Sequence, residues 1–209
     1  MQKHIYALLL GISFIFSIPK VYGASPKPDT ASTEKAESVP SPFKIPSTLS
    51  KDLSDYKRRF MELSGFELSG LHWKQFVRIY VNKRADVYVN NYLEYVRVYL
   101  NTDENADTAA AGKFQAYPVG TIFLKENYKS EDGKPGSPTM LTIMIKHQAG
   151  YYPQGGDWEY IYVGVDGSIL FQGNASNPGV QAMCAKCHGN MRERDFIFST
   201  FCSLTLTGH

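Results

Sequence analysis

The sequence predicts an α+β fold with a mainly antiparallel β-sheet, an N-terminal helix and a short C-terminal helix. Three observations support this fold class. Apolar residues recur every three or four positions from Leu49 to Leu63, as in an amphipathic helix. Five short segments rich in Val, Ile, Tyr and Phe follow between residues 76 and 163, as expected of strands. Two cysteines and a histidine then stand close together at 184–188, near the end of the chain.

Residues 1–23 have the pattern of a signal peptide. The basic residue Lys3 precedes an apolar run from Ile5 to Ile18, which is too short to span a bilayer, and cleavage is predicted after Gly23. We therefore expect the protein to be exported to the periplasm. The alternative is an uncleaved N-terminal anchor.

The rest of the chain divides into a linker and one domain. Residues 24–48 are rich in Pro, Ser, Lys and Thr, a composition that cannot bury a core and predicts a flexible tether. Residues 49–209 are enough for a single domain with its own core. Loss of Lys3 and Lys20 with the signal peptide would leave 20 basic against 20 acidic residues. A formally neutral protein is not expected to bind nucleic acid.

The expected elements of this domain follow in order along the chain. Residues 49–63 form a helix that ends before Gly65. The expected strands, which are short and bounded by Gly, Asn, Pro or Asp, are Phe76–Val81, Leu93–Leu100, Thr121–Glu126, Thr139–Lys146 and Trp158–Val163. The loop at 150–157 joins the last two as a hairpin. Residues 101–112 form a loop with a short helix, and residues 196–201 pack beside the C-terminal helix.

The motif CAKCH at residues 184–188 is typical of the covalent attachment of a c-type haem. On one helical turn, Cys184 and Cys187 can reach the two vinyl groups of a haem, and His188 can bind the iron as the proximal ligand. Predicted export agrees with this interpretation, because haem is joined to such motifs outside the bacterial cytoplasm. The sheet is therefore expected to lie against the other face of the haem.

Two other kinds of site share part of this motif. A structural zinc site would need further ligands, for which Cys202 and His209 are the nearby candidates, but zinc-finger spacing does not place a histidine directly after a cysteine. A thioredoxin-like redox pair is expected after a first strand rather than near the C-terminus. If the haem takes two cysteines, Cys202 remains as a buried thiol or a dimer contact.

The organisation of the chain excludes two common haem folds. A small electron-transfer cytochrome c carries its motif near the N-terminus and a methionine ligand far downstream, whereas only 21 residues follow His188 here, and Met191 is too close in sequence to reach the opposite face. A four-helix cytochrome c′ does carry a late motif. However, the strand-rich region at 76–163 does not fit a helical bundle.

The face of the haem opposite His188 decides the chemistry, because a small molecule can bind there if no side chain fills the sixth position of the iron. His72 and His147 are candidates for that position. Alternation along the strands places Lys125 beside an aromatic residue and Glu159 among aliphatic ones. A carboxyl group in such surroundings has a raised pKa, which suits proton transfer. The alternatives are a solvated charge for Lys125 and a cross-strand salt bridge for Glu159.

Four segments occur in a characteristic order: GTIFLKE at 120–126, GDWE at 156–159, CAKCH at 184–188 and RDFIF at 194–198. Across roughly residues 70–203, this arrangement resembles the cytochrome P-460 family of exported c-type haem proteins. In that family, a β-rich domain holds a haem whose meso carbon is bonded to a lysine, and hydroxylamine is oxidised at the open iron position. The related β-type cytochromes c′ share the fold, lack the bond, and bind nitric oxide or carbon monoxide.

The resemblance implies one haem c attached through Cys184 and Cys187, with an extra cross-link to Lys125, the residue that matches the family lysine. Such a bond would distort the ring and shift its electronics. It also implies hydroxylamine oxidation to nitrous oxide or nitrite, with Glu159 as a distal base and a soluble electron acceptor such as a small cytochrome c. Apart from the resemblance, an exposed sheet edge or Cys202 could support a homodimer. The alternative is a nitric oxide or carbon monoxide binding protein without turnover. One departure is that Arg97 falls on the wrong face of its predicted strand for a distal arginine.

Overall fold

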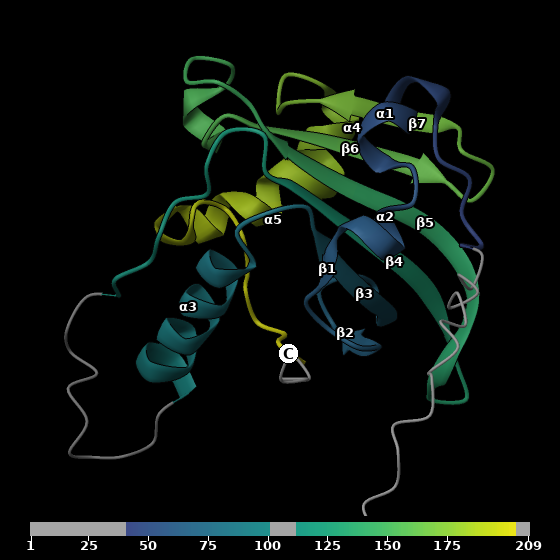
Figure 1. The fold of residues 1–209 in the computed structure, drawn as a ribbon, viewed down its shortest axis with the longest axis horizontal. Coiled ribbons are helices and arrows are strands. Elements are labelled where there is room, and N and C mark those ends of the chain that lie inside the picture. Colours follow the sequence, from purple (N-terminus) through teal and green to yellow (C-terminus); the bar gives the residue numbers. More distant parts are fainter. Residues whose placement is uncertain (1–40, 101–111, 204–209) are drawn as a thin grey trace, which may run out of the picture. The chain divides into compact units, whose positions relative to one another are not determined.

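The computed structural model describes residues 41–100 and 112–203 of the chain. The predicted signal peptide, most of the predicted linker, nearly all of the loop at 101–112, and His209 lie outside these residues. The described part is organised by an antiparallel sheet of seven strands (Figure 1). The strand order is β1-β3-β4-β5-β6-β7, and β2 also pairs with β3. The strands are β1 Met61–Glu62, β2 Glu67–Ser69, β3 Gln75–Val81, β4 Ile122–Glu131, β5 Lys134–Lys146, β6 Trp158–Gly164 and β7 Ile169–Gly173.

The predicted α+β fold with a mainly antiparallel sheet is confirmed. Four of the five predicted strands correspond to β3, β4, β5 and β6, and the predicted hairpin joins β5 to β6 with Ile143 opposite Ile161. The sequence did not predict β1, β2 or β7. Two of these strands have only two or three residues, and β7 is a short edge strand that alternates between half-buried and exposed side chains, so each carries a weak pattern.

The predicted strand at Leu93–Leu100 is wrong. This segment belongs to the helix α3, Ala85–Tyr95, and to the π-helical turn η2, Val96–Leu100. The buried residues of α3 are Val87, Tyr88 and Asn91. Their spacing is helical, and packing of this face overrides the strand propensity of the Tyr and Val residues that follow. Arg97 therefore lies on a helical turn, where it pairs with Glu94 at 2.7 Å.

The predicted helix at 49–63 is present only as short pieces. These are the 3-10 turn η1, Ser47–Leu49, and the helices α1, Ser50–Leu53, and α2, Tyr56–Arg59. Asp55 separates α1 from α2 because its φ of 52° is left-handed. The apolar residues of the predicted helix face are nevertheless all buried: Leu49, Leu53, Tyr56, Phe60 and Leu63. Phe43 is also buried, so the folded part begins before Leu49.

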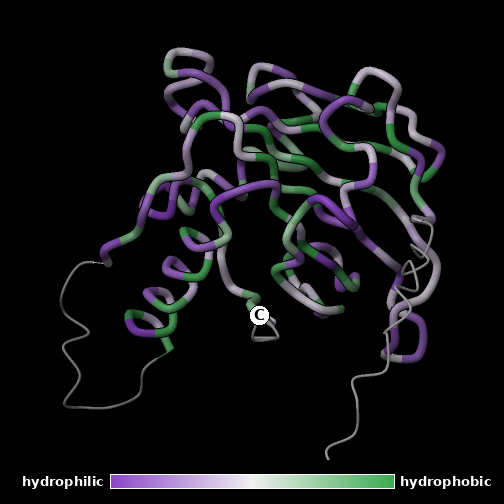
Figure 2. The backbone as a smooth tube through the Cα atoms, viewed as in Figure 1, coloured by the Kyte–Doolittle hydropathy of each residue, from purple (hydrophilic) through white to green (hydrophobic). Residues whose placement is uncertain are grey.

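The central strands are rich in hydrophobic residues (Figure 2). Alternation of their side chains between the two faces of the sheet gives two apolar cores. The first core contains Leu124, Ile143 and Ile161, with residues of η1, α1 and α2 packed on them. The second core contains Phe123, Met144, Trp158 and Tyr160, together with residues of α3 and the C-terminal segment. Cys184 belongs to the second core, so the cysteine and histidine motif is held against the aromatic face of the sheet.

A run of short helical elements, kinked at Met191, carries that motif. It consists of α4, Pro178–Val180, the π-helical turn η4, Gln181–Ala185, α5, Lys186–His188, and the 3-10 segment η5, Gly189–Arg194. Asn177 caps its start by accepting from the Gly179 amide at 2.9 Å, and Pro178 occupies the first helical position. None of the helices in the described residues is long and apolar enough to span a membrane.

Candidate functional site

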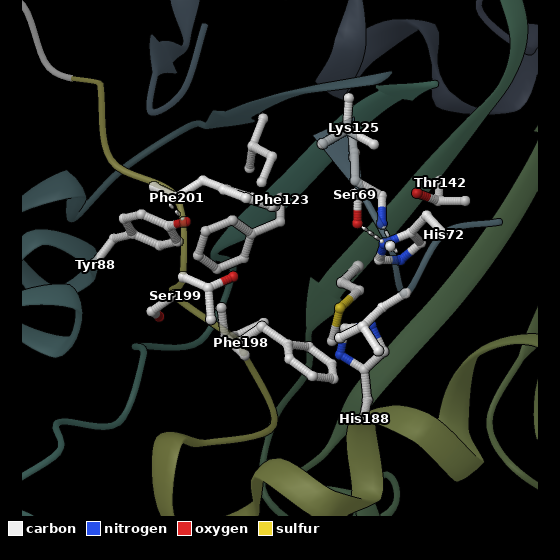
Figure 3. A pocket seen from close by; sticks show the side chains of 17 residues that line it. Ser69, His72, Tyr88, Phe123, Lys125, Thr142, His188, Phe198, Ser199 and Phe201 are labelled. Atoms are coloured by element: carbon white, nitrogen blue, oxygen red, sulfur yellow. Dashed lines mark hydrogen bonds between the residues drawn. The ribbon is translucent and has the colours of Figure 1, made fainter. Parts of the chain in front are cut away.

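The sheet and the C-terminal segment line a partly open apolar cavity of about 240 Å³ (Figure 3). Its walls come from β3, β4, β5, α3 and residues 197–201. A second cavity of about 40 Å³ shares Lys125, His72 and His188 with the first and is also lined by Cys184 and Cys187. The structure therefore brings Lys125, from the middle of the sheet, together with the whole cysteine and histidine motif.

His188 is prepared to bind a metal through one ring nitrogen. Its Nδ1–H donates a 2.7 Å hydrogen bond to the carbonyl of Phe196, which leaves Nε2 as the free nitrogen. The rings of Tyr160 and Phe198 contact the imidazole edge-on, with centroid distances of 5.5 and 5.2 Å. Desolvation lowers the pKa of His188 to about 4, so the ring is neutral at physiological pH, as a metal ligand must be.

The two cysteines of the motif occupy different surroundings. Cys184 is buried and Cys187 is exposed, and burial raises the pKa of the Cys184 thiol to about 11. Both line the cavity that His188 also lines, so two thiols, an imidazole and apolar walls meet as haem c requires. In residues 41–100 and 112–203, no three His, Cys, Asp or Glu side chains gather as a metal site. Cys202 is half-buried and lines neither cavity.

Lys125 lines both cavities from β4, on the same face as Phe123, as alternation predicts. Desolvation lowers the pKa of its amine to about 7, and neighbouring Cys184 opposes this shift. A substantial fraction of Lys125 is therefore a neutral amine near pH 7, and a neutral amine is a nucleophile. Among the described residues, no carboxylate forms an ion pair with this amine.

His72 is the hydrogen-bond partner of Lys125. It lies on the loop between β2 and β3, with Nε2 against the Lys125 amine and Nδ1 2.9 Å from the Ser69 hydroxyl (Figure 3). Desolvation and the Lys125 charge lower the pKa of His72 to about 2, so the ring is neutral. Trp73 and Lys74, the next residues of this loop, have left-handed φ angles of 55° and 56°, and such strained residues gather at functional sites. Because His72 lies on a loop, its position beside Lys125 could not be predicted from the alternation of residues along strands.

Glu159 does not reach the cavity. Its carboxylate contacts His147 Nε2 at 2.7 Å and accepts from the Gln172 amide at 2.8 Å. Alternation along β6 puts Glu159 on the face of Ile161, opposite to Tyr160, whose ring contacts His188. Glu159 therefore has a histidine and an amide as partners outside both cavities, and the geometry gives no support to its prediction as a distal base. His147 also lies outside both cavities, so only His72 of the two candidate histidines lines them.

The family model described as Cytochrome P460 matches residues 55–199. That range contains the sheet, the loop with His72, Lys125 and the motif at 184–188. No curated protein matches the chain.

Proposed function

Because the chain belongs to the cytochrome P460 family and is a c-type haem cytochrome, we propose that it oxidises hydroxylamine at a single haem. Cys184 and Cys187 would hold the haem through thioether bonds, and His188 would bind the iron through Nε2. When bound, the haem supplies the iron that takes up electrons from the substrate. Nitrous oxide or nitrite would be the product, and a small cytochrome c in the periplasm would accept the electrons.

The observation that carries this proposal is the position of the Lys125 amine. It lines the same cavities as both cysteines and His188 and has its pKa lowered to about 7. Placing a lysine in apolar surroundings costs free energy. A covalent bond from its nitrogen to the meso carbon of the haem would replace one N–H and one C–H bond, with the two electrons passing to an oxidant such as a peroxide, and would leave the nitrogen a much weaker base. A lysine cross-link of this kind distinguishes the hydroxylamine-oxidising proteins of the family from the related gas-binding cytochromes c′.

The remaining cavity residues support small-molecule chemistry on the side of Lys125. Aromatic side chains of Phe123, Phe198 and Phe201 line the larger cavity. His72 is the neutral imidazole beside Lys125. We therefore assign hydrogen bonding with the substrate to His72 in place of Glu159.

Replacing Lys125 with alanine tests the proposal. The wild-type holoprotein should show an intact mass lower by the hydrogens lost in an extra cross-link, and a strongly red-shifted ferrous Soret band. The alanine variant should keep its covalent haem, show an ordinary c-type spectrum and lose hydroxylamine oxidation. Lys129→Ala is the matched control, because Lys129 is an exposed lysine of the same strand.

An ordinary c-type spectrum for the wild-type protein, together with a mass that shows no loss of hydrogens, would contradict the enzyme interpretation. The chain would then be interpreted as the alternative, a protein that binds nitric oxide or carbon monoxide without turnover. Binding of these gases to the ferrous protein, followed by absorbance, distinguishes that outcome from a protein whose sixth position is filled by a side chain.

A further inference from the structure

The carbonyl group that orients His188 belongs to Phe196 and lies in a backbone turn that contacts of Asp195 hold in place. Asp195 and Phe196 are consecutive left-handed residues, with φ angles of 51° and 65°. Neither is glycine, so this conformation costs free energy and persists only where contacts hold it. The turn presents the Phe196 carbonyl to the Nδ1–H of His188 at 2.7 Å.

Asp195 makes those contacts with three separate parts of the fold. Its carboxylate accepts from the Lys146 amine at 2.6 and 2.8 Å and from the Tyr117 amide at 2.8 Å. Its carbonyl accepts from the indole of Trp158 at 2.8 Å. Asp195 is thus bonded to the end of β5, to the start of β6 and to the segment before β4, which fixes the turn to the sheet.

Lys146 and Asp195 form a nearly buried ion pair. Their side chains are only 12% and 10% exposed, and the Lys146 amine also lies 5.0 Å from the ring centre of Trp158. Gly156 lets the chain approach this pair, because a Cβ there would lie 2.6 Å from the Phe196 ring and 3.1 Å from the Asp195 carboxylate. Charges held in such surroundings are weakly screened and act on neighbouring groups more strongly than surface charges do.

We propose that Lys146 and Asp195 are positioning residues that hold the proximal histidine and set the reduction potential of the haem iron. The inference rests on the proposed binding of iron by His188 and is independent of the substrate. As a pair, the two charges compensate each other beside the turn that bonds His188. Groups around a metal-bound histidine tune its basicity and the metal in this way. If one charge is removed, the other is left uncompensated beside the turn that bonds His188.

Two single substitutions should therefore shift the potential in opposite directions. Lys146→Met leaves the Asp195 carboxylate, which favours the ferric state, so the midpoint potential should fall. Asp195→Asn leaves the Lys146 ammonium, which favours the ferrous state, so the potential should rise. Lys146→Arg keeps the charge and should stay close to the wild-type value. Spectroelectrochemical titration of each purified holoprotein measures these shifts.

A matched control is the ion pair between Arg78 and Glu62, whose closest atoms are 2.6 Å apart. Alternation along β3 places Arg78 on the face opposite to Val77 and Ile79, which line the cavity. Arg78→Met and Glu62→Gln should therefore shift the potential less than the corresponding changes at Lys146 and Asp195. Resonance Raman of the ferrous proteins adds a second readout, because Asp195→Asn should weaken the bond to Nδ1 and lower the iron–histidine stretching frequency.

Shifts of Lys146→Met and Asp195→Asn in the same direction, or shifts no larger than those of the control pair, would overturn the inference. If Asp195→Asn fails to take up haem, the comparison of Lys146→Met with Lys146→Arg decides alone, and equal potentials for these two overturn it. A wild-type holoprotein that does not oxidise hydroxylamine would instead refute the proposed function, and the measured potentials would still decide the role of the pair.

Discussion

Replacing Glu126 with leucine is expected to destabilise the protein by about 3–5 kcal/mol, the usual cost of breaking a buried ion pair from one side. Glu126 is fully buried on the sheet face opposite to Lys125. It accepts hydrogen bonds from the hydroxyls of Tyr56 and Tyr128, the latter at 2.8 Å, and pairs with the Lys57 amine at 3.2 Å. These bonds tie α2 to the sheet. Leucine would remove the acceptor of the Tyr128 hydroxyl and the anionic partner of Lys57, and the Tyr56 hydroxyl would keep only the Ser41 hydroxyl, 2.9 Å away.

Urea unfolding measures this loss of stability. Glu126→Gln keeps an acceptor at the same place and should cost less, about 1–3 kcal/mol. Glu131→Gln, at an exposed position near the end of the same strand, should change stability by no more than about 0.5 kcal/mol. A Glu126→Leu protein with the urea midpoint of the wild type would show that the buried cluster does not hold α2 in place.

Replacing His188 with alanine is expected to reduce the proposed hydroxylamine oxidation by more than about 100-fold, because even changes around a metal ligand cost about 10–100-fold. The cysteines remain, so the haem should still be attached, and the loss should appear in the spectrum as a missing axial ligand. The activity assay therefore needs a parallel measurement of haem content. His147→Ala is the control, since His147 lies outside both cavities. Unchanged activity and spectrum in His188→Ala would remove His188 as the iron ligand.

Strand alternation predicted the faces of the sheet correctly but could not say which face carries the site. Lys125 and Phe123 share a face, as predicted, and both line the larger cavity. Glu159 also lies on its predicted face, with Ile161, but the motif packs on the other face, against Tyr160. An alternating pattern assigns the residues of a strand to two faces, but it does not say which face carries the functional site. The choice between them is made by contacts between residues far apart in the sequence.

The parts of the site that the sequence did not reveal depend on loops and on helix packing. His72 contacts Lys125 from a loop that contains two left-handed residues. Asp195 contacts Lys146 from a turn of two left-handed residues. Neither conformation follows from a repeating pattern. The helix α3 was missed for a related reason, since its Tyr and Val residues favour strands in isolation, while burial of one helical face decides the outcome.

The most direct test of haem binding by this chain is peptide mass spectrometry of protein purified from a host competent in cytochrome maturation. A proteolytic peptide that contains Cys184, Cys187 and His188 should carry the mass of one haem, and the alkaline pyridine spectrum should be that of a haem joined by two thioethers. Colourless protein, or the same peptide with two free thiols, would contradict haem binding by this chain.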